Sequence, residues 1–396
     1  MTQMFSDLVT MPSDALSVRP LRDDPRADMH RRLPRVLQPV LTWLTAKPAP
    51  GEIVRERKPL RFVTGALVLC AAGILLSALA LHLSWPLAVP LLPLGLLLTA
   101  SGLGLFQVVV FHHCSHGTVF RSRRRNRDVG RLISALLLFK HFDAYQREHM
   151  LHHSANKLFT DEDEFTDFVI GICDLAPGLD KRSLWRKVIG NCLSPAFHAR
   201  FFVKRLRGSL ASPDRAHNLV GSGVYVALFT AAFATGHMLE LMIAWLLPLS
   251  VLLQIATIFR ILCEHRLPAV EVIERRGKAF VCLATAGVFP GKALPARRAS
   301  SVAGFVAWTA WWLNMLTVQL FVRLFVLVGD APCHDFHHRR PATKRWTSYI
   351  QARQADADAG SPGFPANYIE TWGLFRAVDE NLAAMALAPR HVFETR

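Results

Sequence analysis

Two long apolar segments without charged side chains constrain this chain most. Residues 62–84 and 86–111 contain no Asp, Glu, Lys or Arg, and each is longer than the roughly 20 residues that a helix needs to cross a bilayer. A second pair follows at about 218–236 and 241–259, separated only by the short segment 237–240. Because helices satisfy their own backbone hydrogen bonds in lipid, we predict an all-α integral membrane protein with four transmembrane helices in two hairpins.

Basic residues flank these pairs on one side only, which predicts their orientation. They cluster before the first span, after the second and after the fourth, while the two hairpin turns contain no Lys or Arg: Arg55, Arg57, Lys58, Arg61; Arg121, Arg123, Arg124, Arg125, Arg127; Arg266, Arg275, Arg276, Lys278. The positive-inside rule therefore places both termini and the central segment in the cytoplasm. The net charge of +16 fits this topology and attraction to anionic membrane lipids; no nucleic-acid-binding motif accompanies it, so no nucleic-acid partner is expected.

The spans divide the chain into three regions. Residues 1–61 are predicted to form a cytoplasmic N-terminal arm, residues 62–345 the membrane and cap domain, and residues 346–396 a cytoplasmic C-terminal segment. The seven cysteines form no CxxC pair, which is typical of reduced thiols rather than of a disulfide framework.

One further charge-free run, residues 301–322, leaves the topology open. Its tryptophans, Trp308, Trp311 and Trp312, favour a helix in or dipping into the cytoplasmic interface. The alternative is a second crossing paired with residues 279–290. A lone crossing would move everything after it to the opposite side of the membrane.

Three histidine clusters lie beside the apolar runs: HHCSH at 112–116, HMLHH at 149–153 and HDFHH at 334–338. The spacings i, i+3 and i+4 place their imidazoles on one face of a helix, and imidazole binds iron, copper, zinc and nickel. Without His113, eight histidines share these spacings, which is more than the four ligands of a closed single-metal site. Two metal ions are therefore implied. A metal transporter needs ligands near the bilayer midplane, whereas these clusters fall at or beyond the span ends. An enzyme is therefore favoured over a transporter.

The clusters and the sequences around them resemble those of the membrane fatty acid desaturase and hydroxylase superfamily. "HHCSHGTVFRSRRRNRDVGRL", "REHMLHH" and "CHDFHH" are similar to its bacterial acyl desaturase branch, over about residues 60–345. The resemblance implies a non-haem di-iron centre in a cytoplasmic helical cap, dioxygen as co-substrate, and a bacterial inner-membrane location. It also implies a ninth ligand after the fourth span, met by His265 in "RILCEHR". The expected metal ligands are His112, His116, His149, His152, His153, His265, His334, His337 and His338.

Several neighbouring residues are expected to support this centre. His113 faces about 100° away from His112 on a helix, and it joins Glu264 and Asp335 as candidates for orienting the ligands; an ion pair with Arg260 is the alternative for Glu264. Ile261 stands where the acyl-CoA branch has a water-bridging Asn, four residues before His265.

Charged residues near the clusters and small residues in the spans are the candidates for the substrate site. Arg147 and Lys157 are candidates for binding the substrate head group, and the acidic stretch at 161–167 is expected to be a solvated loop. Small residues in the spans, Gly102, Gly104, Gly221 and Gly223, either leave room for an acyl chain or permit close helix packing.

The resemblance also indicates a reaction. An alkyl C–H bond has no acidic proton, so side-chain acid–base chemistry cannot attack it and the cofactor must supply the difficult step; no separate side-chain acid or base is assigned. We expect desaturation of a fatty acyl chain, with hydroxylation, oxidative decarboxylation to a terminal alkene, or oxidation of a non-acyl lipid or metabolite as alternatives. The chain has no dinucleotide, haem or iron–sulfur motif, which implies an external electron donor such as a ferredoxin with its reductase.

Overall fold

The computed structural model describes residues 24–54, 56–296, 300–390 and 392–393. The predicted arm at 1–61 is therefore described only from residue 24. Helices dominate the fold, and the described sheet is a short parallel pair of β1 (Gly287–Phe289) and β2 (Glu370–Trp372). The seven cysteines are all free thiols, as the sequence predicts.

The first apolar pair folds as a tightly packed hairpin. It comprises α5 (Leu60–Ala80) and α6 (Trp85–Gly104), and the second helix continues through the π-helix η2 (Leu105–Phe111) into α7 (His112–Ser115). A Cβ atom added at Gly102 would lie 2.6 Å from Cys70 Sγ and 2.8 Å from the carbonyl oxygen of Ala66. Gly102 therefore permits close packing of the two helices. Gly104 likewise permits close packing against Val328, and Gly221 against Leu210. Gly223 has open space beside it.

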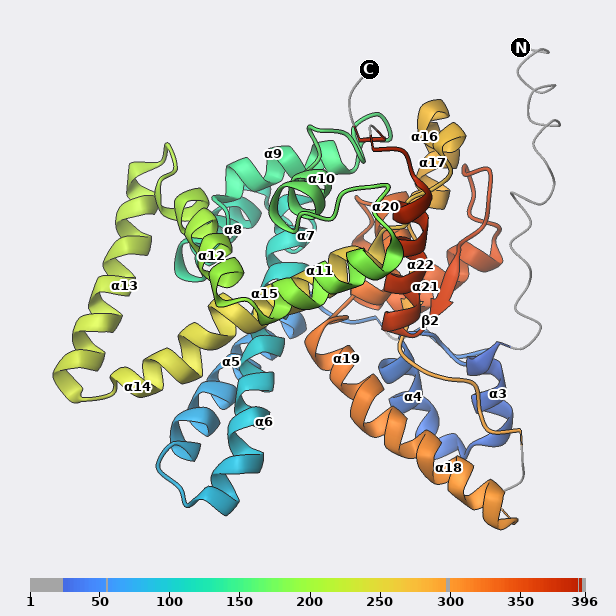
Figure 1. The fold of residues 1–396 in the computed structure, drawn as a ribbon, viewed down its shortest axis with the longest axis horizontal. Helices are drawn as coiled ribbons and strands as arrows, with labels where there is room; N and C mark the ends of the chain where they lie inside the picture. Colours follow the sequence, from blue (N-terminus) through green and yellow to red (C-terminus); the bar gives the residue numbers. More distant parts are fainter. Residues whose placement is uncertain (1–23, 55, 297–299, 391, 394–396) are drawn as a thin grey trace.

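The second pair leaves the body beside the first (Figure 1). Its elements are α13 (Arg215–Thr235), α14 (Met238–Glu240), the π-helices η4 (Leu241–Leu246) and η5 (Pro248–Leu252), and α15 (Leu253–Glu264). Gly236 ends α13 with a φ of 78°, a left-handed conformation that glycine adopts without steric cost. The two hairpin turns meet where His82 Nε2 lies 2.7 Å from Glu240 Oε1.

A fifth helix also has the length and composition of a membrane span, so the predicted number of four is not confirmed. It runs through α18 (Val302–Asn314), η6 (Met315–Gln319) and α19 (Leu320–Phe325), and it packs on α3 (Pro25–Arg32) and α4 (Gln38–Thr45) through Met29, Leu41, Leu44, Trp311 and Met315. The alternative crossing at 279–290 is wrong, because that segment forms the short helix α17 (Gly277–Ala284) and then β1. A helix of eight residues spans only about 12 Å, too little for a bilayer.

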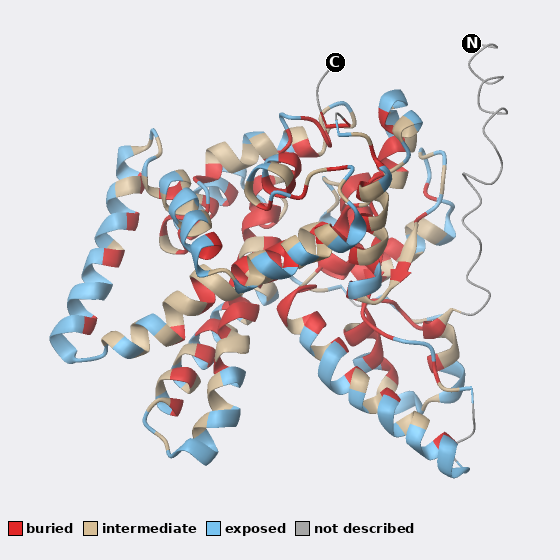
Figure 2. Ribbon diagram, viewed as in Figure 1, coloured by how far each residue is buried: buried red, intermediate tan, exposed pale blue. Residues whose placement is uncertain are grey.

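The remaining helices form a cap over one end of the hairpins. They are α8 (Arg123–Leu136), α9 (Phe142–His152), α10 (Glu164–Thr166), η3 (Asp167–Ile172), α11 (Lys181–Leu193), α12 (Pro195–Leu210), α16 (Val270–Arg275), η7 (Ala331–Cys333), α20 (His334–Arg339), η8 (Lys344–Ser348), α21 (Tyr349–Asp358) and α22 (Leu374–Leu387). The short helix η1 (Arg35–Leu37) instead joins α3 to α4, beside α18. Buried residues concentrate where the cap meets the hairpin ends, whereas the far parts of the helices are mostly exposed (Figure 2).

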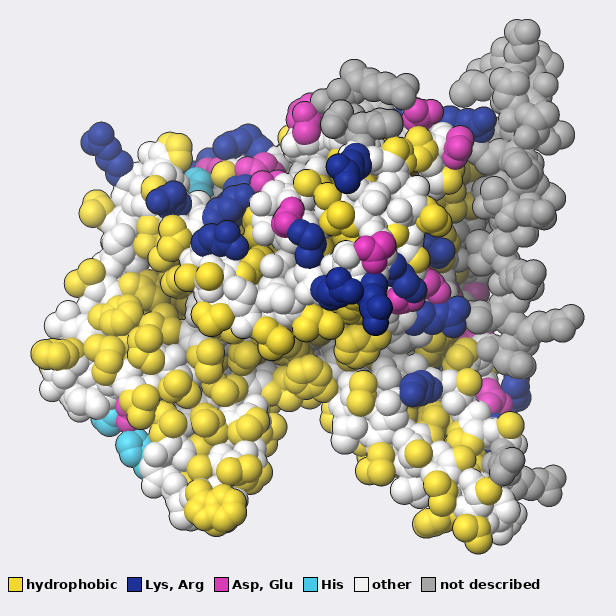
Figure 3. Space-filling model, in the orientation of Figure 1, with side chains coloured by type: hydrophobic (Ala, Val, Ile, Leu, Met, Phe, Trp, Pro, Cys, Tyr) yellow, Lys and Arg dark blue, Asp and Glu magenta, His cyan; other side chains and the backbone are white. Residues whose placement is uncertain are grey.

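Charged side chains are also distributed unevenly between the cap and the hairpins. Acidic and basic side chains gather over the cap, and hydrophobic side chains cover the hairpins (Figure 3). The C-terminal region belongs to the cap core, since Val378 and Leu382 of α22 are fully buried in the main hydrophobic cluster. The apolar surface on the hairpins identifies the part of the protein that lipid would cover.

Candidate metal centre

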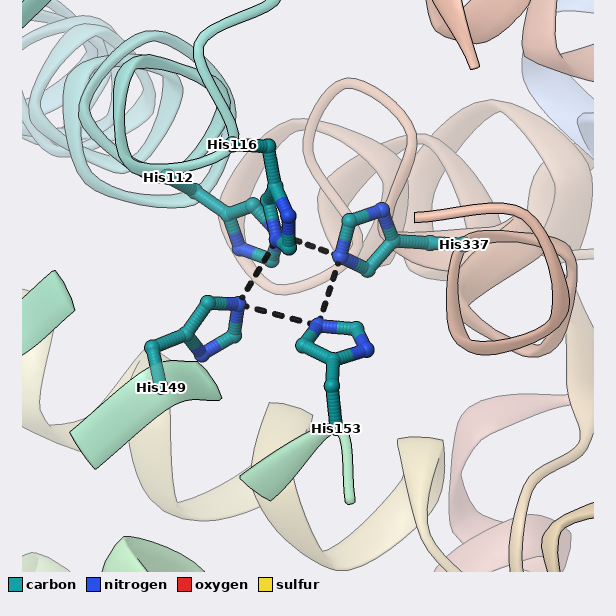
Figure 4. Close-up of side chains that lie close together, drawn as sticks. All are labelled: His112, His116, His149, His153 and His337. Carbon is teal, nitrogen blue, oxygen red and sulfur yellow. Dashed lines mark hydrogen bonds between the residues drawn. The ribbon is translucent and has the colours of Figure 1, made fainter. Parts of the chain in front are cut away.

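The nine histidines expected as ligands meet at the cap end of the hairpins, in two groups. Five belong to the first group, His112, His116, His149, His153 and His337, and four to the second, His152, His265, His334 and His338. Within each group the candidate ligand atoms all lie within 4.8 Å of one another. Figure 4 shows the five imidazoles of the first group converging from three separate segments.

Helical spacing explains how each segment contributes. His149 of α9 and His153, which directly follows the helix, are four residues apart and belong to the first group. His152, the last residue of α9, belongs to the second. In α20, His334 and His338 serve the second group, and His337 serves the first. Each of these two helices therefore supplies ligands to both groups, which fixes the groups side by side.

The contacts within each group fit metal ligation. His112 Nε2 lies 2.7 Å from His337 Nε2, and His149 Nε2 lies 3.1 Å from the Nε2 atoms of both His116 and His153. In the second group, His338 Nε2 lies 3.0 Å from His334 Nε2 and 3.3 Å from His265 Nε2. Two nitrogens that each lie about 2.1 Å from the same metal ion can be at most about 4.2 Å apart, so these separations allow a shared ion. At these distances two nitrogen lone pairs that face each other repel, so either a proton on one of them or a metal ion must lie between them.

Burial keeps most of these imidazoles neutral, which is the form that binds a metal. Burial and the neighbouring histidines lower the pKa of His116 to about 2. The same two causes hold the pKa values of His153, His265, His334, His337 and His338 well below the usual range. A cluster of this kind is costly to protonate, because every added proton would place a charge in a buried site that already holds several donors.

Two carboxylates that the sequence did not assign fix the orientation of the α9 histidines. His152 Nδ1 donates to Asp163 Oδ1 at 2.8 Å, and His149 Nδ1 donates to Glu164 Oε1 at 3.0 Å. Burial lowers the pKa of His152, but the charge and hydrogen bond of Asp163 outweigh it and leave that pKa raised. Asp163 is only 1% exposed, so the expectation of a solvated loop at 161–167 is wrong at this position. The sequence signal for this contact is a carboxylate eleven residues after His152, but only the tertiary structure brings the two side chains together.

The residues expected to orient the ligands form hydrogen bonds with groups other than the candidate ligands. His113 belongs to neither metal group; its Nε2 donates to Asp330 Oδ2 at 2.7 Å, and its ring stacks on Trp346 with centroids 4.1 Å apart. Asp335 contacts no imidazole through a hydrogen bond that the described residues show, and instead accepts from the Arg353 guanidinium at 2.7 Å.

Glu264 likewise pairs with a cation rather than with a ligand. Its Oε2 accepts from Arg260 Nη1 at 2.9 Å, which is the alternative that the sequence left open. The side chain is only 1% exposed, and both Glu264 and Ile261 line the cavity that ends at the histidines.

That cavity has a volume of about 390 Å³ and lies between η2–α7, α9, α10–η3, α12 and α15. Its inner end is formed by histidines of both groups, His112, His149, His152, His265 and His334. Its walls are largely apolar: Val108, Phe111, Phe139, Phe165, Phe168, Ile172, Phe201, Leu253 and Ile261. Arg147 and Lys157, the expected head-group residues, do not line it. The cationic residues that do are Lys140, Lys204, Arg205 and Arg260.

Comparison with known proteins agrees with this arrangement. The family model described as "Fatty acid desaturase" matches residues 85–281, which include His112, the α9 histidines and His265. No curated protein and no solved structure shows a significant match to the chain. The third histidine cluster lies outside the matched residues, yet α20 supplies candidate ligands to both groups. The chain therefore belongs to the membrane fatty acid desaturase/hydroxylase superfamily.

Proposed function

We propose that this oxidoreductase uses two iron ions and dioxygen to desaturate a fatty acyl chain, with electrons from an external carrier. The observation that supports this most is the convergence of nine imidazoles, in groups of five and four, at the closed end of an apolar cavity. Membership of the desaturase superfamily gives the class of reaction. A transporter is disfavoured because the two groups lie together at one end of the spans, and the described residues contain no further group of possible metal ligands along the spans.

The residues present fit the implied iron centre. One ion would be held by the five-histidine group and the other by the four-histidine group. Iron with dioxygen supplies the oxidising power to remove hydrogen from an unactivated alkyl carbon, which no side chain in the cavity can supply. Asp163 and Glu164 accept hydrogen bonds from Nδ1–H of His152 and His149, so Nε2 of each ring keeps the lone pair that would bind a metal.

The cavity walls position the substrate. Phe111, Phe139, Phe165 and Phe201 can enclose an acyl chain and exclude water from the histidine end, because burying each methylene group is favourable by about 0.8 kcal/mol. The distance of each carbon from the centre decides whether a second hydrogen is removed, giving an alkene, or a hydroxyl group is added. We favour the alkene, and hydroxylation and oxidative decarboxylation are the alternatives within the same class.

The cellular setting follows from charge and topology. We infer a bacterial inner-membrane protein with four crossings, in which α18–α19 lies in or dips into the interface without crossing. The cap and both termini are then in the cytoplasm, because the basic flanks of the four spans lie on the cap side. An external donor such as a ferredoxin, which is typically acidic, would be attracted to this basic cap.

Mass spectrometry of lipids and volatiles from a host that expresses the protein tests the function. A host expressing His152→Ala is the control, and iron is measured in both purified proteins. A wild-type product that has lost two hydrogens supports desaturation, while an added oxygen or a shortened terminal alkene reassigns the reaction within the class. Purification of the wild type without iron would refute the proposal.

A further inference from the structure

We propose that the acyl chain enters the cavity while still attached to an anionic membrane phospholipid, whose phosphate binds a basic groove on α12. This inference rests on the proposed function and names the substrate class for it. The groove is a shallow surface depression of about 480 Å³, separate from the internal cavity. Ala199, Arg200, Val203, Lys204 and Arg207 line it.

The groove is built by the periodicity of one helix. Arg200, Lys204 and Arg207 are spaced i, i+4 and i+7, so their side chains lie along one face of α12. Among the described residues, no carboxylate lies within ion-pair distance of Arg200 or Arg207, and Lys204 pairs with Asp167 at 2.9 Å. Two arginines that are free of internal partners can bind phosphate oxygens, for which the guanidinium fork is well suited.

Lys204 connects the groove to the substrate cavity, because it lines both. The neighbouring face of α12 supplies Phe201, Arg205 and Gly208 to the cavity wall. A single helix therefore separates a surface site for a charged group from an internal site for an apolar chain. Lys204 is half exposed and marks the mouth between them.

Exposed apolar residues place this mouth at the lipid surface. Ile189 and Leu193 of α11 are 51% and 76% exposed, and Val203 inside the groove is 45% exposed. Figure 3 shows basic side chains gathered over the α12 region, directly beside the apolar surface of the hairpins. Cations next to exposed aliphatic side chains are typical of surfaces that bind anionic lipid head groups.

This arrangement favours a phospholipid over a free fatty acid. The carboxylate of a free acid is bonded directly to its chain, so with the chain in the cavity it could pair with Lys204 at the mouth but would leave Arg200 and Arg207, which line only the groove, unused. In a phospholipid, the glycerol unit separates the phosphate from the acyl chain and allows both sites to be filled at once. The buried Arg205 already donates to the carbonyl oxygens of Leu137, Leu138 and Leu249, so it is largely occupied.

Binding of spin-labelled lipids to the purified, iron-loaded full chain in a neutral detergent tests the inference. The probes are phosphatidylglycerol, stearic acid and stearoyl-CoA, each with a nitroxide on the acyl chain, and immobilisation of the label reports entry of the chain. We expect Arg200→Gln/Arg207→Gln to weaken phosphatidylglycerol binding about tenfold, the factor that corresponds to roughly 1.4 kcal/mol. Arg182→Gln/Arg186→Gln removes the same charge from exposed positions on α11 and should leave binding unchanged.

A second variant tests the path of the chain. A Cβ at Gly208 would have Lys140 Cγ as its nearest neighbour, at 3.9 Å, so Gly208→Leu should fold while its larger side chain obstructs the mouth. We expect this variant to lose the immobilised signal of phosphatidylglycerol.

Three results would overturn the inference: equal weakening by the control pair, unchanged binding in both groove variants, or tighter binding of stearoyl-CoA or stearic acid than of phosphatidylglycerol. Lipid binding is read without turnover. Its failure is therefore distinguishable from failure of the proposed function, which the iron content and products of the same preparations report.

Discussion

Replacing Asp163 by Asn should release iron from the four-histidine group, although the two side chains have nearly the same shape. A carboxylate only accepts hydrogen bonds, so Asp163 Oδ1 fixes the proton of His152 on Nδ1, 2.8 Å away. An amide nitrogen at that place would instead donate to Nδ1. The proton of His152 then moves to Nε2, and the lone pair that would bind the metal is lost.

The expected magnitude follows from the other contacts of Asp163. Its Oδ2 accepts from the backbone nitrogen of Phe159 at 2.8 Å, which an Asn carbonyl oxygen can preserve. Its Oδ1 also accepts from the backbone nitrogen of Phe165 at 3.1 Å, which an amide nitrogen cannot. Loss of a carboxylate that orients a ligating histidine typically lowers metal affinity by about 10–100-fold. The unsatisfied Phe165 N–H should cost about 1–3 kcal/mol of stability in addition.

The assay is iron per polypeptide after equilibration with a competing chelator, together with the thermal unfolding midpoint. Glu162→Gln is the matched control, since Glu162 lies in the same acidic stretch, is half exposed and pairs with Lys157. His152→Ala gives the limit for loss of the ligand itself. If Asp163→Asn retains iron as tightly as the wild type while His152→Ala does not, the role given to Asp163 in fixing the tautomer is wrong.

Four further predictions concern the two metal groups and the packing around them. His338→Ala should lower the iron content to about half while His113→Ala retains both ions, which metal analysis of the purified proteins can show; equal loss would contradict the two-group assignment. Arg353→Met leaves the buried Asp335 carboxylate unpaired and should destabilise the cap by about 3–5 kcal/mol, whereas a midpoint near that of the wild type would argue against this ion pair. Gly102→Val forces a side chain against the Ala66 carbonyl and should cost about 1–3 kcal/mol or more, to be compared with Gly223→Ala, which has open space. The pKa values of His153, His265 and His334 are lowered in the folded protein, so below about pH 6.5 the unfolded chain binds more protons than the folded one. Each of these histidines should therefore lower the free energy of unfolding by about 1.4 kcal/mol per pH unit below that value, and should have no effect above about pH 7.5. A thermal unfolding midpoint that is constant down to pH 5 would contradict this.

The sequence determined those features that depend on local spacing. Charge-free runs long enough to cross a bilayer identified the two hairpins. The i, i+3, i+4 pattern of the clusters identified eight of the nine histidines that meet at the centre. Both signals are local: one depends on the length of a helix and the other on the face of a helix. His265, which lies outside the three clusters, needed the resemblance to the desaturase superfamily.

The tertiary structure decided which residues meet across long separations in the chain. The division of the histidines into five and four depends on how α9 and α20 cross, and the roles of Asp163 and Glu164 depend on a loop that folds back onto α9. Arg147 and Lys157 were candidates for binding a head group because of their charge, but the charge of a side chain does not indicate which cavity it lines. The surfaces on either side of α12 likewise exist only after packing, because a cavity is enclosed by segments that share no sequence pattern.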